Sequence, residues 1–456
     1  MKIAYIAAGA AGMYCGSCLH DNRLARVLLE LGEDVILVPT YTPIRTDEVD
    51  VSHGRVFFGG INAYLQQHVP LFRKTPRWVD RLFNSRWLLN LATSGAGSVD
   101  PAKLGGMTVS MLRGEEGHQA KEVDKLVDWL VDEVQPDVVH LSNSMLLGMA
   151  RRINQRCGPP VVCALSGEDI FLEQLAEPHY SQARALLRER AAEVAAFTTL
   201  NRYYADFMAD YLAVDRAKVH VVPHGLDLTE YSEEAADHRL RLEIGEERWQ
   251  TLNSPDVVHE HLPGVPVIGY LARICHDKGL HVLVEACELL NKMPGFEYGF
   301  ELKVAGYLGE GDKPYFAEIL KRIERADMTG IFYHNGELSL GEKIDFLRGL
   351  NVFCTPTVYR ESKGLPAIEA LAAGTPVLLP DHGSFPELVA ESGGGLLHRP
   401  EDPAHLAERL AELLADLDRA RKLGETGREH VHTHRHARRM AENTLGLYGT
   451  IVSQAV

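Results

Sequence analysis

The sequence predicts an α/β fold made of two similar halves, and three observations carry this prediction. Short apolar runs rich in β-branched and aromatic residues alternate with helical patterns, beginning with KIAYIAA and CLHDNRLARVLLELG. This alternation indicates βαβ units, in which parallel strands form a sheet covered by helices on both faces. A polar, acidic stretch at residues 229–262 interrupts the alternation, which then starts again with PVIGYLA. We therefore expect two Rossmann-like domains facing each other across a cleft, the usual place for a ligand.

Each half contributes its own set of expected strands. The first half contains the runs KIAYIAA, DVILVP, DVVHL, PVVCALS, AAFTTL and KVHVVP, and the second half contains PVIGYLA, FELKVAG, GIFYHN, NVFCTP and PVLLP. We place the N-terminal domain at residues 1–228, the connector at 229–262 and the C-terminal domain at 263–430. A final helical segment at 431–456 is expected to cross back to the N-terminal domain.

Composition excludes several classes of protein. The chain has 456 residues, a formal net charge of -16 and a sequence pI near 5.7, a balance that repels a polyphosphate backbone and argues against nucleic acid as a partner. Seven cysteines spread along the chain do not resemble a secreted disulfide framework, so a reduced, cytoplasmic setting is expected. The N-terminus meets glycines too early for a signal peptide, and no apolar run approaches the roughly 20 residues that span a bilayer.

The segment RESKGLPAIEALAAGTPV has the signals of a short helix. Pro366 suits a first turn and Gly374 suits the position after the last turn, so the helix is expected at about 365–373. Gly364 and Leu365 then present backbone N–H groups at the helix N-terminus, where anions bind readily.

Charged side chains near this helix predict the rest of the ligand. Glu361 precedes the helix and Glu369 lies one turn inside it, and both carboxylates can accept hydrogen bonds from sugar hydroxyls. Arg273 and Lys278 follow the strand PVIGYLA, so they lie at a carboxyl strand end, where open α/β sheets bind ligands. A nucleotide sugar combines these requirements, because it carries sugars on either side of a diphosphate.

These motifs resemble those of family 4 glycosyltransferases, which are retaining enzymes of the GT-B fold. The family pattern of Arg followed five residues later by Lys-Gly matches Arg273, Lys278 and Gly279, and its Glu-x7-Glu element matches Glu361 and Glu369. The run EALAAGTPV matches as well, and the first glycine loop, PDVVH and VVPHGLD are weaker matches in the N-terminal half. The resemblance covers nearly the whole chain and is most specific in the C-terminal half.

The resemblance implies a catalytic set of Arg273, Lys278 and Glu361. The two cations would hold the diphosphate as the sugar departs, and Glu361 would bind hexose hydroxyls. The implied reaction retains the anomeric configuration through an ion-pair-like transition state, with the leaving phosphate helping to deprotonate the acceptor. It uses no cofactor and no metal ion, and its main device is electrostatic stabilisation of the leaving group.

The donor-binding set extends beyond the catalytic residues. Glu369 would accept hydrogen bonds from the ribose, and Gly364 and Leu365 would donate backbone N–H groups to the phosphates. The loop Gly9-Ala-Ala-Gly12, between the first strand and a helix, is expected near the donor phosphates. It lacks the spacing of a dinucleotide-binding loop, which argues against an oxidoreductase.

The acceptor-side prediction involves the N-terminal domain. Ser166, in the sequence ALSGED, stands where family members carry a histidine that contacts the transferred sugar. His140 and His224 follow predicted strands near the expected cleft, and for each a ligand-binding role and a structural role remain open.

Other patterns leave two readings open. Cys15 and Cys18 form a Cys-x-x-Cys pair that fits redox or metal chemistry, or packing beside the donor site. Cations and aromatic residues mix at 72–89, which fits a helix on an anionic membrane surface or a solvated helix over the acceptor cleft. Alternating histidines near the C-terminus fit a metal site or a solvated helix face: His430, His432, His434 and His436.

The sequence therefore predicts a hexosyltransferase that uses a nucleotide sugar, with UDP and GDP donors both compatible. The acceptor hydroxyl could belong to a glycan, a lipid-linked sugar or a small metabolite, and the oligomeric state is open. The expected location is the cytoplasm, with peripheral contact at the inner membrane face as an option. The alternatives are a GT-B protein that binds sugar nucleotides or glycans with little transfer, and a GT-B epimerase or phosphorylase.

Overall fold

A computed structural model describes most of the chain and divides it into two compact units. The described residues are 1–9, 16–44, 46, 48–53, 57, 66–67, 101–232, 234–235, 239, 265–297 and 299–455. The first unit comprises Met1–Gly225 and Ala437–Val456, and the second comprises Leu226–His436. Most of the predicted connector lies outside the described residues, as does the segment 72–89.

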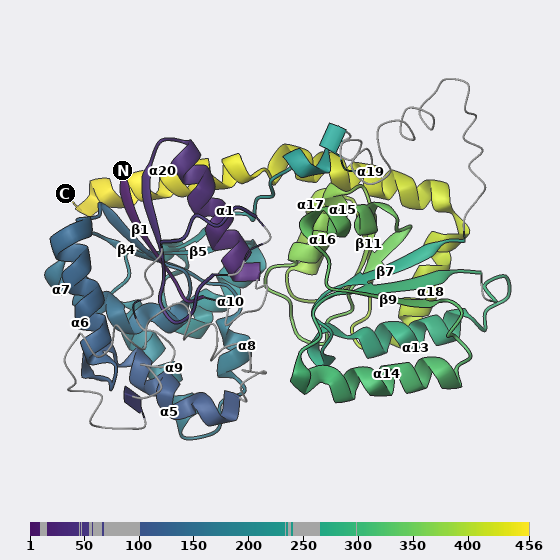
Figure 1. Cartoon of the computed structure of the whole chain (residues 1–456), viewed down its shortest axis with the longest axis horizontal. Coiled ribbons are helices and arrows are strands. Elements are labelled where there is room, and N and C mark those ends of the chain that lie inside the picture. The colour runs from purple at the N-terminus through teal and green to yellow at the C-terminus, as the bar shows by residue number, and fades with distance from the viewer. Residues whose placement is uncertain are drawn as a thin grey trace. The chain divides into compact units, whose positions relative to one another are not determined.

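The first unit contains a parallel sheet of six strands in the order β2-β1-β3-β4-β5-β6 (Figure 1). Its strands are β1 (Lys2–Ala7), β2 (Asp34–Pro39), β3 (Val138–Leu141), β4 (Val161–Ala164), β5 (Ala196–Thr199) and β6 (Val219–Val221). Its helices are α1 (Gly16–Glu30), α5 (Pro101–Leu112), α6 (Ala120–Trp129), α7 (Ala150–Arg156), α8 (Glu168–Leu172), α9 (His179–Ala191), α10 (Arg202–Leu212) and α20 (Ala437–Ala455).

Helices cover both faces of this first sheet. Alternate residues of β1 belong to two separate cores: Ala4 and Ile6 pack with α5, α6 and α9, whereas Ile3 and Tyr5 pack with α1 and α20. Because both faces of β1 are buried, apolar residues occupy successive positions of the strand instead of alternating with polar ones.

The second unit contains a parallel sheet in the order β12-β11-β10-β7-β8-β9. Its strands are β7 (Val267–Leu271), β8 (Glu301–Ala305), β9 (Phe332–Gly336), β10 (Val352–Cys354), β11 (Val377–Pro380) and β12 (Gly395–His398). Its helices are α13 (Leu280–Leu290), α14 (Lys313–Arg325), α15 (Leu340–Arg348), α16 (Leu365–Ala372), α17 (Phe385–Ser392), α18 (Pro403–Ala415) and α19 (Leu417–His434). Figure 1 shows α13 and α14 on one face of this sheet and α15, α16 and α17 on the other.

The α/β class and the two Rossmann-like domains are confirmed, and all eleven expected strands are present. The sequence analysis missed β12, a strand of four residues that follows consecutive glycines. Gly395 lies so close to β11 that an added Cβ would be 2.1 Å from the carbonyl oxygen of Val377. The glycine that made this segment resemble a loop is therefore required by close strand packing.

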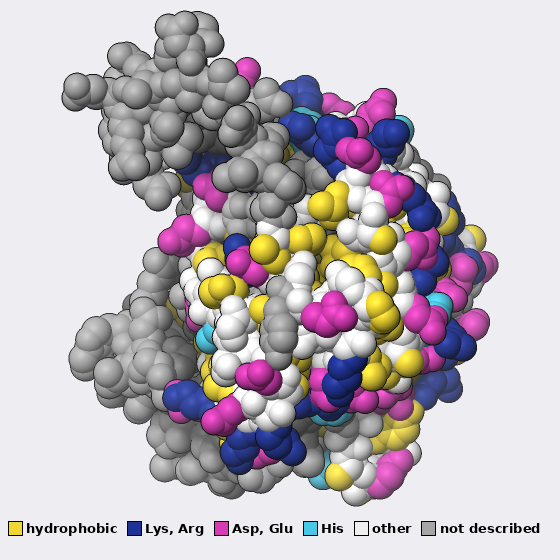
Figure 2. Space-filling view, turned by 90° about the vertical axis from the view of Figure 1, so that its right-hand side faces the viewer, with side chains coloured by type: hydrophobic (Ala, Val, Ile, Leu, Met, Phe, Trp, Pro, Cys, Tyr) yellow, Lys and Arg dark blue, Asp and Glu magenta, His cyan; other side chains and the backbone are white. Residues whose placement is uncertain are grey.

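The C-terminal helix belongs to the first unit. The break between α19 and α20 falls at Arg435 and His436, and α20 packs against α1. No helix in the described part of the chain is long and apolar enough to cross a bilayer. Figure 2 shows acidic and basic side chains interspersed over one face.

Candidate functional site

The loops after β7 and β10 meet at the carboxyl edge of the second sheet. These two strands are neighbours, and the strand order reverses between them, which is where open α/β sheets bind ligands. The amide of Val358 donates to the carbonyl of Asp277 at 2.9 Å. Gly279 has a φ of +74°, and an added Cβ would lie 1.8 Å from the carbonyl oxygen of Pro356. The two loops are therefore in direct contact.

Gly279→Ala is expected to separate these loops and to destabilise the second unit. The new Cβ meets backbone rather than a flexible side chain, and the positive φ adds strain of about 1–3 kcal/mol. Chemical denaturation should show the loss. Gly330→Ala is the matched control, because nothing lies within 4 Å of the position of its Cβ. Equal stability of the two variants would contradict the described loop contact.

Lys278 and Glu361 form an ion pair across this contact. The Nζ of Lys278 lies 2.7 Å from Oε2 of Glu361, and the Tyr359 hydroxyl hydrogen-bonds to both groups. The other oxygen of Glu361 accepts hydrogen bonds from the amides of Ser362 and Lys363, each at 3.1 Å. Burial alone would raise the pKa of Glu361, but the Lys278 ammonium and these hydrogen bonds lower the pKa to about 2. Glu361 is therefore a buried, ionised carboxylate.

Arg273 lies on the same β7 loop and is exposed. Its Nε donates to the Sγ of Cys275 at 3.3 Å, which directs the base of the guanidinium back toward its own loop. The structure thus brings two of the predicted cations and Glu361 to one edge of the sheet.

Helix α16 begins as predicted. It spans Leu365–Ala372, with Gly364 in the left-handed region at its N-terminus and Pro366 in its first turn. The next helix, α17, begins nearby, because the amide of Ser384 donates to the carbonyl of Glu361 at 2.8 Å. Gly364 and Leu365 follow Glu361 closely in the chain, so the start of α16 belongs to the same loop as the Lys278–Glu361 pair.

Three buried hydroxyls, two on the loop after β10 and one at the start of α17, were not predicted. Within the described residues the side-chain oxygens of Thr355, Thr357 and Ser384 have no hydrogen-bond partner. Buried hydroxyls are ordinarily paired, so these groups indicate a polar environment that accepts water or ligand. Thr355 and Thr357 directly follow β10, a position at a carboxyl strand end that could have marked them in the sequence.

Glu369 has a partner that the sequence analysis did not name. Its Oε1 lies 2.7 Å from Nζ of Lys343 on α15, and the two side chains are only 4% and 10% exposed. Helix α15 is fixed at its start by a capping box formed by Ser339 and Glu342. Lys343 therefore reaches Glu369 from a rigid helix.

Ser166 follows β4 at the carboxyl edge of the first sheet. Its amide and hydroxyl both donate to the carboxylate of Glu168, and its Oγ lies 3.3 Å from Oγ of Ser17 on α1. After β1, Gly9 has a φ of +91°, and an added Cβ would lie 2.0 Å from the carbonyl oxygen of Thr42. Gly12 and the rest of the glycine loop lie outside the described residues, so the predicted place of this loop near the donor phosphates stays a prediction.

His140 lies in the core, which favours its structural alternative. Its ring stacks on Tyr5 with centroids 4.4 Å apart, its Nδ1 hydrogen-bonds to the hydroxyl of Tyr448 on α20, and it is 2% exposed. Burial lowers the pKa of His140 to about 3, so the ring is neutral. His140 lies near the end of β3, as the sequence indicated, but α20 covers its side chain. A local sequence pattern cannot reveal this contact, because α20 is about 300 residues further along the chain.

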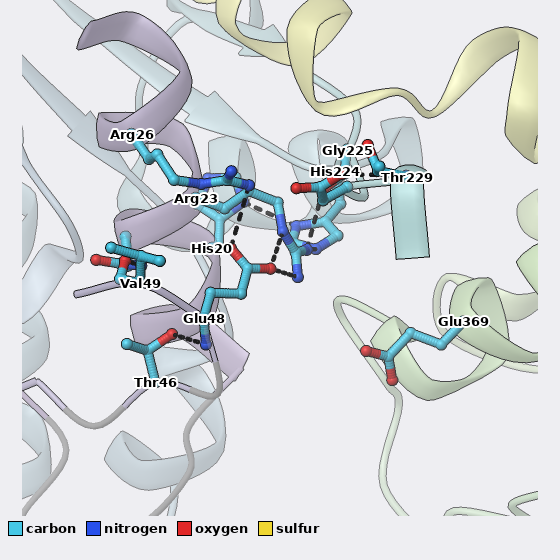
Figure 3. Close-up of polar contacts among 12 residues, drawn as sticks. His20, Arg23, Arg26, Thr46, Glu48, Val49, His224, Gly225, Thr229 and Glu369 are labelled. Atoms are coloured by element: carbon cyan, nitrogen blue, oxygen red, sulfur yellow. Dashed lines mark hydrogen bonds and ion pairs between the residues drawn. The ribbon is translucent and has the colours of Figure 1, made fainter. Parts of the chain in front are cut away.

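His224 belongs to a polar chain in the first unit. Its Nδ1 lies 2.8 Å from Nδ1 of His20, and its Nε2 lies 3.1 Å from NH1 of Arg23. Arg23 is in turn paired with Glu48, and the side chains of this pair are 3% and 7% exposed. Figure 3 shows these four side chains pointing toward one another. The sequence analysis named only His224 of this group.

No group of three or more metal-binding side chains gathers among the residues that the structure describes. In the C-terminal histidine series, the rings of His430 and His434 are 4.9 Å apart, while His432 donates to the carbonyl of Ala372. Cys15 lies outside the described residues, so the two readings of the Cys15 and Cys18 motif, redox or metal chemistry and packing beside the donor site, both stay hypotheses.

Two family models match the chain, one on each unit. The model of glycosyl transferases group 1 matches residues 257–430, and that of the glycosyl transferase 4-like domain matches residues 22–225. Together these models cover most of the chain, which belongs to the glycosyltransferase family that they describe and has the GT-B fold. The match agrees with the resemblance that the Arg273, Lys278 and Glu-x7-Glu motifs indicated.

Two relatives of this chain are named for reactions of sugar or inositol phosphates. Alpha-maltose-1-phosphate synthase of Mycolicibacterium smegmatis is 31% identical over 255 residues, which are 53% of this chain and 59% of that protein. D-inositol 3-phosphate glycosyltransferase of Nocardia farcinica is 33% identical over 232 residues, which are 48% of this chain and 44% of that protein. The glycosyltransferase thus matches about half the length of these curated relatives.

Solved structures share the fold over the whole chain. Sucrose-phosphate synthase from Thermosynechococcus elongatus has a TM-score of 0.68 at 17% identity, covering 100% of both chains. The Anabaena protein HepE in complex with UDP has a TM-score of 0.64 at 15% identity, covering 99% of this chain and 100% of that one. At these identities the likeness shows that the glycosyltransferase has this fold.

Proposed function

We propose that the protein transfers a hexosyl group from a nucleotide sugar to a sugar hydroxyl, with retention of the anomeric configuration and without a metal ion. The observation that carries this proposal is the juxtaposition of Lys278, Glu361 and the N-terminus of α16 at the switch point of the second sheet. The positive end of a helix dipole and an ammonium group together suit a diphosphate.

The proposed donor site assigns a chemical task to each group. Arg273 and Lys278 stabilise the negative charge that grows on the diphosphate as the glycosidic bond breaks, and the amides of Gly364 and Leu365 add fixed dipoles. Glu369 accepts hydrogen bonds from ribose hydroxyls, since its carboxylate lies one turn inside α16. Glu361, held ionised by Lys278, has its orientation fixed for the hydroxyls of the hexose.

Retention follows from the chemistry proposed for the leaving group. The bond from the anomeric carbon to the phosphate oxygen breaks first, and the electron pair leaves with the diphosphate. The acceptor hydroxyl attacks the same face and gives its proton to a phosphate oxygen. The protein supplies positioning and positive charge, so the protein itself needs no covalent nucleophile.

Donor and acceptor classes are also part of the proposal. The solved HepE structures hold UDP and UDP-glucose, which favours a uridine nucleotide sugar as the donor. GDP sugars are the alternative donors to be compared with it. The relatives named above are enzymes of phosphorylated sugars and inositol, which favours a small phosphorylated acceptor. A lipid-linked acceptor with membrane contact depends on residues 72–89, which lie outside the described part.

A nucleotide-sugar screen followed by a transfer assay tests the proposal. UDP-glucose, GDP-mannose and the free nucleotides are compared by thermal shift, because a ligand that binds the native state raises the unfolding temperature. The stabilising donor is then incubated with sugar-phosphate acceptors, and NMR reads the product anomer, with and without EDTA. An α-linked product from an α-linked donor in EDTA is expected. A β-linked product overturns retention, and donor binding without any transfer supports the binding-protein alternative.

A further inference from the structure

Lys278, Tyr359 and Glu361 form a closed ring of hydrogen bonds in which each donor and acceptor is determined. An ammonium group only donates and an ionised carboxylate only accepts, so Lys278 donates to the Tyr359 hydroxyl and to Oε2 of Glu361. The hydroxyl then donates its own proton to the same Oε2, at 2.7 Å. Burial and the Glu361 charge raise the pKa of Tyr359 well above its ordinary value, so this proton stays on the phenol.

Within the described part of the second unit, this ring uses two of the three N–H bonds of Lys278. The two acceptors, the Tyr359 oxygen and Oε2 of Glu361, are themselves only 2.7 Å apart, so both lie on one side of the ammonium nitrogen. The three N–H bonds have tetrahedral directions, and the third therefore points away from the ring. The Lys278 side chain is 22% exposed, so a ligand can approach the ammonium from solvent.

The backbone holds Tyr359 at a fixed place beside Lys278. The residue before Tyr359, Val358, donates its amide at 2.9 Å to the carbonyl of Asp277, which is the residue before Lys278. The two side chains therefore start from backbones that are joined one position away. The ring of Tyr359 also attracts the cation, since its centroid lies 4.8 Å from Nζ of Lys278. A lysine stem is flexible, so this second anchor restricts an ammonium that one ion pair alone would leave mobile.

We propose that Tyr359 is a positioning residue for Lys278, and that its hydroxyl directs the third N–H of the ammonium to a diphosphate oxygen of the bound nucleotide sugar. This inference rests on the proposed function, in which Lys278 stabilises the leaving diphosphate, and it adds the residue that orients this charge. A preorganised cation needs no reorganisation as negative charge grows on the leaving group. Glu361 cannot orient the ammonium alone, because a single hydrogen bond lets the ammonium rotate about it.

Tyr359→Phe tests the proposal, because it removes the hydroxyl and keeps the ring. The direct pair of Lys278 and Glu361 remains, so the variant should fold. We expect kcat to fall by about 10- to 100-fold, the effect of losing one hydrogen bond to a charged group, with a smaller change in the KM for the nucleotide sugar. Tyr333→Phe is the matched control. Tyr333 is 44% exposed and its hydroxyl donates to the carbonyl of Gly330, so both constants should stay unchanged.

A double-mutant cycle separates positioning from packing. If Tyr359 acts through Lys278, Tyr359→Phe should lower kcat much less in a Lys278→Met background, because no ammonium remains to be oriented. Equal losses in the two backgrounds overturn the proposal, since they show that Tyr359 acts independently of Lys278. A wild-type kcat in Tyr359→Phe overturns it as well.

Calorimetric titration with UDP repeats this cycle without turnover. Tyr359→Phe should weaken UDP binding by a few-fold in the wild-type background and leave it unchanged in the Lys278→Met background. A wild type that binds UDP but transfers no sugar refutes the proposed function, and the UDP cycle then still decides whether Tyr359 orients Lys278 toward phosphate. Equal losses of UDP affinity in both backgrounds refute the positioning role alone, and a wild type that does not bind UDP refutes both.

Discussion

Lys278→Met is expected to reduce the rate of sugar transfer by about 10²- to 10³-fold, the usual effect of removing one preorganised charge-stabilising group. Lys278 is partly exposed while its partner Glu361 is buried, so the ammonium can face both the carboxylate and the proposed diphosphate. Methionine keeps most of the length of the side chain and removes the ammonium group, that is, the charge and its N–H donors. The loss should appear in kcat, because the charge on the leaving group develops in the transition state.

We also expect the stability difference between the wild type and Lys278→Met to depend on pH. In the native protein the pKa of Glu361 is about 2, below its ordinary value of 4.5. Its ionised form therefore contributes stability above pH 4.5, and this contribution is lost as pH falls toward 2. Without Lys278 the pKa of Glu361 rises. The difference in unfolding free energy between wild type and variant should be largest above pH 4.5 and shrink in acid.

Lys313→Met provides the control for this prediction. Lys313 pairs with Glu310 at the surface, with side chains that are 56% and 77% exposed, so removing its charge should change neither rate nor stability appreciably. If Lys278→Met turned over at the wild-type rate with an unchanged fold, the assignment of the diphosphate to this edge would be wrong.

Lys343→Met is expected to weaken nucleotide binding and to destabilise the second unit. It leaves Glu369 buried without its cation, and breaking a buried pair in this way costs about 3–5 kcal/mol. In the proposed site Glu369 holds the ribose, so the variant should also lose much of its preference for UDP over 2′-deoxy-UDP. Calorimetric titration with these two nucleotides measures the preference, and denaturant unfolding measures the stability.

A double variant separates stability from binding. Lys343→Met/Glu369→Leu removes both charges and should recover most of the lost stability, because an apolar pair can replace a buried ion pair at little cost. It should not recover the ribose preference, since the accepting carboxylate is gone. Recovery of the preference in the double variant would show that Glu369 does not read the ribose.

Local patterns predicted the elements of this fold well. The eleven expected strands are present, and α16 begins at Leu365 as the Pro366 and Gly374 signals indicated. These features depend on residues that are close in the sequence. The burial of a strand and the start and end of a helix are each determined by the residue types at a few consecutive positions. The strand β12 was missed because its glycines serve a close contact with β11, a partner that the local sequence does not name.

By itself the sequence determined the α/β class, the two halves, and the position of Arg273, Lys278, Glu361 and Glu369 at strand ends and a helix start. Only the tertiary structure decided how these charges pair. The paired residues are far apart in the sequence: Lys278 and Glu361 are separated by 83 positions, Glu369 and Lys343 by 26, and His20 and His224 by 204. Strand order brings such distant loops together, and burial then makes each pairing strong, so neither the partner nor the resulting proton positions can be read from periodicity along the chain.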